Sequence, residues 1–318
     1  MTASEWLPVR EAWFRALYGP AGFYQREQPR DHFRTSVHAS GLFAEAMVGL
    51  VRQLDLDGIT DFGTGSAELL AHVHGINPEL LLTGIDLRPR PDGLATAVEW
   101  RQVPVDATAP AGSTAGLGSR SLLLLNEVLD NVPCDVVERA PDGALHVVEV
   151  NSKTGDTRLG DPASAEAVAW VQRWWPVSRP GQRVEVGLSR DVMWADLCAF
   201  MPGGACLAID YGHLRGNRPA GGTLTSYRCG RQTGLRYDGA HDVTASVAVD
   251  SLVAQTGGQL SLQRELLHGL GVHGARPPRE LASRDPRGYV LLLARATQAA
   301  ELTAIPGLGA FHTLLCRP

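Results

Sequence analysis

Cysteine is scarce in this sequence and follows no recognisable spacing. Five cysteines occur in 318 residues, and no two of them form a CxxC pair. An odd number without paired spacing argues against both a disulfide framework and a zinc site. We therefore expect reduced thiols and no bound metal. The five are Cys134, Cys198, Cys206, Cys229 and Cys316.

Long apolar runs and an excess of basic residues are missing as well. No stretch reaches the roughly 18 apolar residues that a membrane span needs. The first residues include Glu5 and Trp6 in place of a basic leader. The formal net charge of −5 argues against a general basic surface for nucleic acid. We expect a cytoplasmic protein that binds neither a membrane nor a nucleic acid.

The remaining composition is that of an ordinary globular protein. Hydrophobic residues make up 44% of the chain and charged residues 20%. A chain of 318 residues can bury roughly three quarters of its unfolded surface. This length fits one large domain, or one domain with a substantial insertion.

The most informative stretch, residues 59–68, reads as an apolar strand, a glycine turn and the start of a helix. Gly63 and Gly65 can adopt positive φ and allow a ligand to approach the backbone closely. The N–H groups that open the following helix would point at that ligand. Asp86 ends the next apolar run about twenty residues later, where a carboxylate binds a ribose in Rossmann-type folds. These features together predict a nucleoside site.

The identity of the nucleoside follows from the acidic residues near the turn. The dinucleotide fingerprint has glycine at its sixth position, whereas this chain has Glu68. A carboxylate beside the helix N-terminus would repel a pyrophosphate. S-adenosylmethionine has no phosphate and carries a cationic sulfur and an ammonium, so Asp61 and Glu68 suit it better. A nicotinamide dehydrogenase is the more distant alternative.

The pattern after residue 58 alternates strands and helices, which predicts an α/β fold with a mostly parallel sheet. The expected strands of this core are 58–62, 81–85, 98–104, 121–125, 205–209, 259–264 and 310–316. Helices are expected at 163–174, 190–200, 246–256 and 287–303, and another strand at 182–187.

Three segments depart from this alternation. Residues 1–50 are expected to be helical and to form a cap, with amphipathic helices at 11–18 and 42–51. Residues 136–139 and 145–150 are expected to form a hairpin around Pro141-Asp142-Gly143. Residues 214–242 are rich in glycine and arginine and are expected to form an active-site loop or flap. The predicted organisation is thus a cap at 1–50 and a core domain at 51–318, with insertions at about 134–190 and 214–245.

Candidate chemical groups lie where the predicted strands end, because open α/β sheets bind ligands at that edge. Glu127 and Asp130 follow the strand that ends near Asn126, and one helical turn would place both carboxylates on a common face. A solvated or helix-capping acidic pair is the alternative. Tyr211 follows another strand and either lines the site or packs at the strand end. Asp106 either binds an adenine amino group or is a simple turn residue.

A set of motifs spread over most of the chain resembles the MidA-like family of S-adenosylmethionine-dependent methyltransferases, which includes the mitochondrial complex I assembly methyltransferase. The motifs occur in the family's order and are more specific as a set than the glycine turn. They are Gly22-Phe23-Tyr24, residues 31–36, Leu42-Phe43, residues 61–65, residues 126–133, residues 209–212, residues 222–227 and residues 242–247.

The resemblance implies a Rossmann-like methyltransferase fold, S-adenosylmethionine as cofactor, and an arginine in a protein or peptide as methyl acceptor. It implies cofactor-binding roles for Asp61, Gly63, Thr64, Gly65, Asp86, Asp106 and Asn126. It implies catalytic roles for Glu127, Asp130, Asn126 and Tyr211, with the two carboxylates orienting the guanidinium.

The chain departs from the family pattern at several positions. Ala67 occupies the third glycine position, Val128 and Asn131 change the acidic motif, and Ser246 replaces a common histidine. A small-molecule methyltransferase therefore stays open, as does a non-catalytic assembly protein that retains the cofactor pocket. For a protein methyltransferase and for a small-molecule methyltransferase alike, the methyl acceptor is the main expected partner. A homodimer is also possible.

Overall fold

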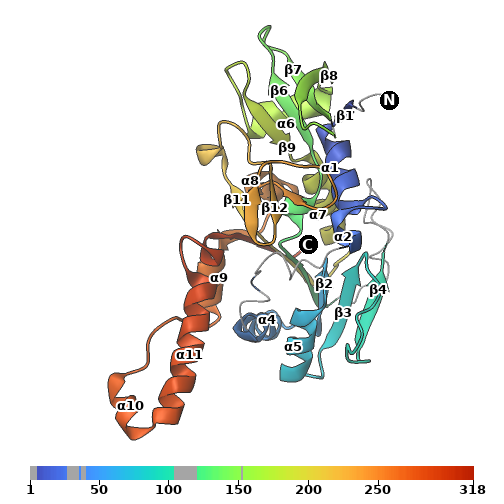
Figure 1. Ribbon diagram of the computed structural model, residues 1–318. Coiled ribbons are helices and arrows are strands. Elements are labelled where there is room, and N and C mark those ends of the chain that lie inside the picture. Colours follow the sequence, from blue (N-terminus) through green and yellow to red (C-terminus); the bar gives the residue numbers. More distant parts are fainter. Residues whose placement is uncertain (1–5, 27–35, 37–40, 104–119, 152) are drawn as a thin grey trace.

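A seven-stranded sheet forms the centre of the computed structural model, which describes residues 6–26, 36, 41–103, 120–151 and 153–318 (Figure 1). Five neighbouring strands, β10, β5, β2, β3 and β4, pair in parallel, whereas β17 is antiparallel to both β10 and β16. In sheet order the strands are β16 (Gln259–Leu262), β17 (His312–Cys316), β10 (Ala205–Asp210), β5 (Ser121–Asn126), β2 (Gly58–Phe62), β3 (Leu81–Asp86) and β4 (Val98–Gln102).

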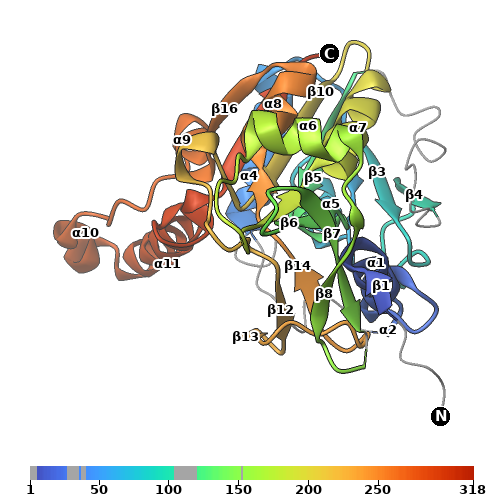
Figure 2. The ribbon, with the colours of Figure 1, turned by 90° about the horizontal axis from the view of Figure 1, so that it is seen from above.

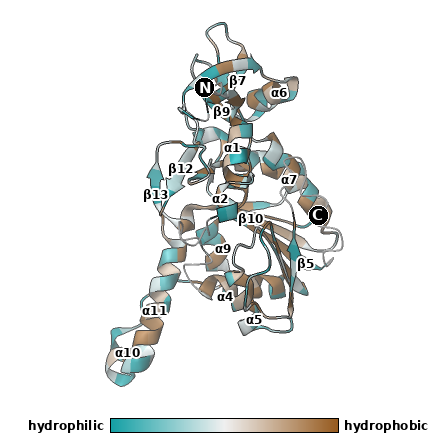
Figure 3. Cartoon of the chain, turned by 45° about the vertical axis from the view of Figure 1, so that its right-hand side comes forward, coloured by the Kyte–Doolittle hydropathy of each residue, from teal (hydrophilic) through white to brown (hydrophobic). Residues whose placement is uncertain are grey.

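The central strands are apolar on both sides because helices cover both faces of this sheet. In β5, Leu122 and Leu124 belong to one core cluster, and Leu123 and Leu125 belong to the other. The hydropathy colouring shows brown strands and brown inner helix faces in this region (Figure 3). The first cluster includes α4 (Gly41–Gln53) and α5 (Glu68–Ile76), and the second includes α7 (Leu188–Ala199) and α8 (Val249–Thr256).

A second, antiparallel sheet of five strands carries the predicted hairpin. Strands β6 (Asp135–Arg139) and β7 (Leu145–Asn151) pair as expected, and α6 (Ala165–Trp174) packs against β9. The sheet order is β1 (Trp6–Pro8), β7, β6 and β9 (Arg183–Val186), with β8 (Thr157–Pro162) paired to β7. The α/β class is confirmed, but the sheets of the chain are mixed and the expectation of a mostly parallel arrangement is too simple.

The N-terminal segment is not purely helical, so that prediction is wrong in part. Before α1 (Val9–Tyr18) and α2 (Phe23–Arg26), strand β1 pairs antiparallel with β7, with Leu7 opposite Val150. A strand of three residues has too little periodicity to be seen in a sequence, and pairing with the edge of β7 creates it. The division into a cap and a core domain stays a prediction.

The segment 214–242 contains strands where a loop was expected. After β11 (Gly212–His213) and the short helix η4 (Arg215–Asn217), β12 (Thr225–Arg228) pairs with β13 (Arg231–Thr233) and β14 (Asp242–Thr244), while β15 (Val247–Ala248) pairs with β11. Arg228 lies opposite Arg231, so Cys229 and Gly230 form a two-residue turn, and both have positive φ. The sequence gives little sign of this turn because asparagine or aspartate usually precedes the glycine.

Near the C-terminus the chain builds a helical arm that projects from the body (Figures 1 and 2). Asp285 caps α11 by accepting a hydrogen bond from the Gly288 N–H, and Pro286 occupies the first helical position. Val290 and Leu291 are exposed on this arm. Across the described ranges, no helix has the length and hydropathy needed to cross a bilayer. The arm comprises α10 (Arg279–Arg284) and α11 (Pro286–Thr303), whereas α9 (Gln263–Gly269) packs against β16 and β17 in the body.

Candidate active site at the carboxyl ends of the central strands

The parallel pairing of β3, β2, β5 and β10 brings the predicted site residues to one edge of the sheet. Ile85 and Leu125 both lie opposite Phe62, and Ile209 lies opposite Asn126. The residues that follow these positions, Asp86 and the turns after β2, β5 and β10, are therefore neighbours in space. The edge matches the one at which open α/β sheets bind ligands.

The turn after β2 has a left-handed backbone at three positions. Gly63, Gly65 and Ala67 have φ values of 71°, 65° and 62°. A Cβ at Gly63 would lie 2.9 Å from a methyl of Val128, whereas at Gly65 the nearest atom is an Arg88 nitrogen at 3.5 Å. Packing thus requires glycine at position 63, while the backbone at Gly65 keeps an open side for a ligand.

Two carboxylates hold this turn in place through hydrogen bonds. Asp86 accepts a hydrogen bond from the Gly65 N–H at 2.8 Å, and its other oxygen accepts from the backbone and side chain of Arg88. Asp61 accepts from the Thr64 hydroxyl at 2.6 Å, and burial raises the pKa of Asp61 to about 7. The structure thus brings all these predicted cofactor-binding residues together. Asp106 lies outside the described residues.

The acidic turn after β5 is not the regular helical turn that was expected. Glu127 has a positive φ of 56°, and the short helix η3 (Leu129–Asn131) follows it. The Glu127 N–H donates to the Ile209 carbonyl at 2.8 Å, which prolongs the pairing of β5 with β10 and prevents a helix from starting there. The Glu127 carboxylate accepts from the Ser36 N–H at 3.1 Å and, weakly, from the Asn126 amide at 3.4 Å.

Asp130 and Tyr211 are joined by a direct hydrogen bond. The Tyr211 hydroxyl donates to Asp130 at 2.6 Å, and the Thr244 hydroxyl donates to the same oxygen at 2.6 Å. Asp210 accepts from the Asp130 N–H at 3.1 Å. This network connects the ends of β5, β10 and β14, and Thr244 and Asp210 are members that sequence reasoning did not single out as site residues.

A second group of side chains lies beside this network. The Asn131 amide and the Tyr24 hydroxyl both donate to Asp242, at 3.0 and 3.3 Å. The Tyr18 hydroxyl donates to the Asn131 carbonyl, and the Tyr18 and Tyr24 rings stack at 5.4 Å. Tyr24, Asn131 and Asp242 all fall in the motifs that carry the family resemblance, and this was the signal that could have identified them.

The site is acidic and buried, and its polar groups are incompletely paired. Burial raises the pKa of Glu127 to about 8 and raises those of Asp130, Asp210 and Asp242 above the ordinary range. Within the described residues, three buried acceptor oxygens at this edge have no hydrogen-bond donor, namely Asn126 Oδ1, Asp130 Oδ1 and Asp210 Oδ1. Buried acceptors without donors are unusual, and a cationic group with several N–H donors would satisfy them.

Arg190 is the buried cation that holds the two sides of the site together. It is 2% exposed, and its guanidinium donates to the carbonyls of Asp130, Val132 and Ser246. The guanidinium also lies 5.6 Å from the ring centre of Trp13 in α1. Because these carbonyls belong to the turns after β5 and β14, Arg190 fixes the relative position of both turns.

Comparison with known proteins gives one family and a set of similar folds. Residues 76–265 match the model of a family described as "Putative S-adenosyl-L-methionine-dependent methyltransferase". Among curated proteins, none matches with significance.

Two solved structures from Burkholderia thailandensis have a similar fold. One is described as a "likely methyl transferase" bound to S-adenosyl-homocysteine; it is 24% identical, with a TM-score of 0.76. The other, a native structure of an uncharacterized protein, is 23% identical, with a TM-score of 0.72. Each comparison covers 99% of this chain and 88% of the other.

Replacing Arg190 with methionine should lower the free energy of unfolding by about 3 kcal/mol, because buried carbonyls would lose their donors. Arg158 provides a matched control, since it also lies over a tryptophan, Trp6, but is 53% exposed. Arg158→Met should cost less than about 1 kcal/mol. Urea unfolding of both variants measures the two losses, and equal losses would contradict the role given to Arg190.

The raised pKa of Glu127 predicts a pH dependence of stability. Between the ordinary value of 4.5 and the folded value of about 8, the folded protein holds a proton that the unfolded chain releases. Glu127 therefore stabilises the fold below pH 4.5, and this contribution is lost as the pH rises through 8, by up to about 1.4 kcal/mol per pH unit. Urea unfolding across this window should show a flatter pH profile for Glu127→Gln than for the wild type, and an equally steep profile in the variant would contradict the assignment.

Proposed function

The chain belongs to the family of putative S-adenosyl-L-methionine-dependent methyltransferases whose model matches residues 76–265, and from this membership we propose that it methylates an arginine side chain in a protein or peptide. In this proposal the parallel strands β4, β3, β2, β5 and β10 form a Rossmann-like core. The cofactor would bind at the ends of β2 and β3, and the acceptor would bind beyond β5.

The main support for a cationic acceptor is a set of buried carboxylate oxygens that have no hydrogen-bond donor in the part of the chain that the structure describes. In this acidic cluster, Asp130 and Asp210 each present a buried oxygen without a donor among the described residues, and Glu127 lies nearby. A guanidinium offers five N–H donors and a positive charge, which would lower the pKa values that burial raises. A neutral acceptor would leave the carboxylates without compensation.

The residues at the first two strand ends fit the cofactor. The open side of Gly65 leaves room for a ligand, and the Asn126 Oδ1 oxygen lacks a donor that an ammonium could supply. Gly63, Thr64 and Gly65 would contact it through their backbone, Asp86 would bind the ribose hydroxyls, and Asp61 would hold Thr64 in place. When bound, S-adenosylmethionine supplies a methyl group that its cationic sulfur has already activated.

Glu127 is the proposed proton acceptor. A guanidinium stays protonated in water, so its nitrogen becomes nucleophilic only as a proton leaves. Burial raises the pKa of Glu127 in the free protein, and the charge of a bound guanidinium would lower it again, so that Glu127 would be ionised when the acceptor is bound. The ionised carboxylate could then take the guanidinium proton while the new N–C bond forms. Asp130, held by Tyr211 and Thr244, would orient the guanidinium, and much of the rate would come from this alignment.

The cap and the second insertion are proposed to complete the acceptor side. Tyr18 and Tyr24 come from residues 1–50, and Asp242 and Thr244 come from the segment 214–245. Both segments therefore contribute side chains to the cluster, which supports the predicted organisation of the chain around one core.

Gly65→Val should weaken binding of S-adenosylhomocysteine by about 100-fold or more, equivalent to about 2.7 kcal/mol, because the side chain enters the open space. Gly93→Val is the matched control, since Gly93 also has a positive φ (75°) and has no atom within 4 Å of the point where a Cβ would lie. Both variants place a valine at a position with positive φ and so carry similar backbone strain. Calorimetry with S-adenosylhomocysteine then shows how much affinity is lost through the side chain at position 65 itself. Equal affinities in the two variants would place the cofactor elsewhere.

Glu127→Gln should keep S-adenosylhomocysteine affinity within about threefold while methyl transfer falls roughly 10²- to 10⁴-fold. Radiolabelled methyl transfer into lysate protein and into the small-molecule fraction measures the activity. Label in arginine of a protein supports the proposal. Label only in small molecules would indicate the alternative acceptor class, and retained activity would remove Glu127 from the mechanism.

A further inference from the structure

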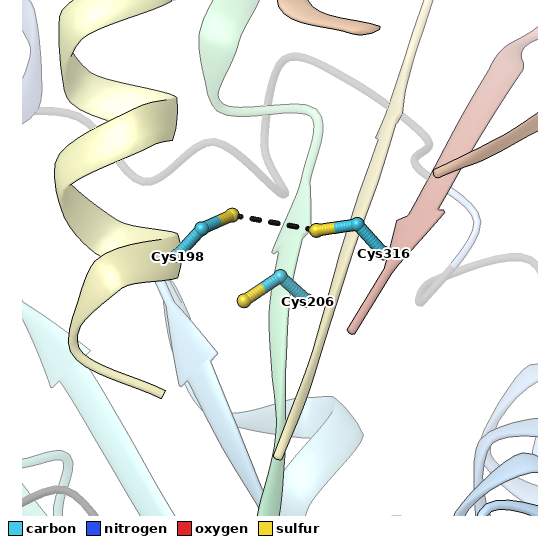
Figure 4. Close-up of side chains that lie close together, drawn as sticks. All are labelled: Cys198, Cys206 and Cys316. Carbon is cyan, nitrogen blue, oxygen red and sulfur yellow. Dashed lines mark hydrogen bonds between the residues drawn. The ribbon is translucent and has the colours of Figure 1, made fainter. Parts of the chain in front are cut away.

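Cys198 and Cys206, which are close in the sequence, meet the distant Cys316 in the core (Figure 4). Cys198 lies in α7, Cys206 in β10 and Cys316 in β17, and each is at most 3% exposed. Their sulfur atoms all lie within 4.8 Å of one another, and the Cys198 and Cys316 sulfurs are 3.6 Å apart. The sequence could not indicate this cluster because the residues have no ligand-like spacing.

Strand register and helix packing produce the cluster. Cys206 and Cys316 lie directly opposite each other in the antiparallel pair of β10 and β17, so both side chains point to the same face. Helix α7 covers that face and adds Cys198, together with Trp194 and Leu197. The sulfurs are therefore held by rigid elements and not by a loop.

We propose that these three thiols bind one thiophilic d10 metal ion, Cu⁺ or Zn²⁺. Metal–sulfur bonds of about 2.3 Å place three sulfurs about 4 Å apart around a common centre, close to the separations in this cluster. Thiolate ligands select such soft ions, and a filled d shell imposes no geometry of its own. Within the described residues, no histidine, carboxylate or further cysteine joins the three.

Binding would exchange protons for the ion, and the charge balance depends on which ion binds. Zn²⁺ with three thiolates releases three protons and leaves one negative charge. Cu⁺ leaves the same charge if two thiols lose their protons and the third stays protonated. Apolar surroundings penalise any buried charge, so the single negative charge costs less in both cases than a larger charge would.

A polar side chain lies beside the cluster. The Thr256 hydroxyl hydrogen-bonds to Cys316. The same hydroxyl accepts from the Trp194 indole N–H at 2.8 Å, which fixes its position. Such a hydrogen bond next to a ligand atom is typical of metal sites.

The ion would join α7, β10 and β17 behind the acidic cluster. Helix α7 carries Arg190, and β10 ends at Asp210, so the metal would stabilise the elements that position both residues.

Anaerobic titration of the reduced full chain tests the site. Cd²⁺ reports on the Zn²⁺ mode through its thiolate charge-transfer absorption, and Cu⁺ is titrated against a competing chelator. We expect one ion per chain and a higher melting temperature on binding. Release of three protons identifies the Zn²⁺ mode, and release of two identifies the Cu⁺ mode.

Alanine variants of the three cysteines, which keep the site apolar, should each weaken binding by about 100-fold or more. The matched control is Cys229→Ser, which removes an exposed thiol outside the cluster and should change nothing. Retained S-adenosylhomocysteine binding shows that a variant is folded. Unchanged binding in the triple alanine variant would overturn the proposal.

X-ray absorption of the wild-type protein loaded with Zn²⁺ or Cu⁺ gives an independent result if a variant fails to fold. Two to three sulfur neighbours at about 2.3 Å support the site. A shell made only of nitrogen and oxygen would rule it out.

Discussion

The parallel pairing of β3, β2, β5 and β10 is the constraint on which the rest of the structure depends. Because these strands are buried on both faces, a one-residue slip of β5 would move each of its leucines into the opposite core cluster and disrupt the packing of both. Their carboxyl ends therefore meet at one edge, and Asp86, Gly65, Asn126 and Asp210 become neighbours. The helices on the two faces secure this edge but contribute few groups to it.

The buried acidic groups at this edge lower the stability of the free protein. Burial raises the pKa values of Asp130, Asp210 and Asp242, and the charge of Arg190 offsets this in part at Asp130 and Asp210. In a site that binds a cation, the buried acidic groups would be unfavourable until the cation binds. Glu127 and Ala67 have a positive φ, and both lie at the same edge of the sheet. Backbone strain of this kind is often found in functional sites.

Local sequence patterns predicted the elements that have strong periodicity. The leucine run of β5, the glycine turn after β2 and the amphipathic pattern of α1 all correspond to observed elements. The failures have a common cause. Strand β1 and the β12–β13 hairpin exist because a partner strand pairs with them, and the turn at Cys229 has a residue type that rarely signals such geometry. The helical turn expected at Glu127 was overridden by a hydrogen bond to β10.

The sequence by itself determined the α/β class and the glycine turn after β2 with its nearby acidic residues, because these depend on residues close together in the chain. Only the tertiary structure decided which distant side chains meet. Thr244 and Asp242 reach Asp130 and Asn131 through the packing of β14, and three scattered cysteines converge where α7 covers β10 and β17. The physical reason is that periodicity encodes the face a residue occupies, whereas strand register and helix packing determine what lies opposite that face.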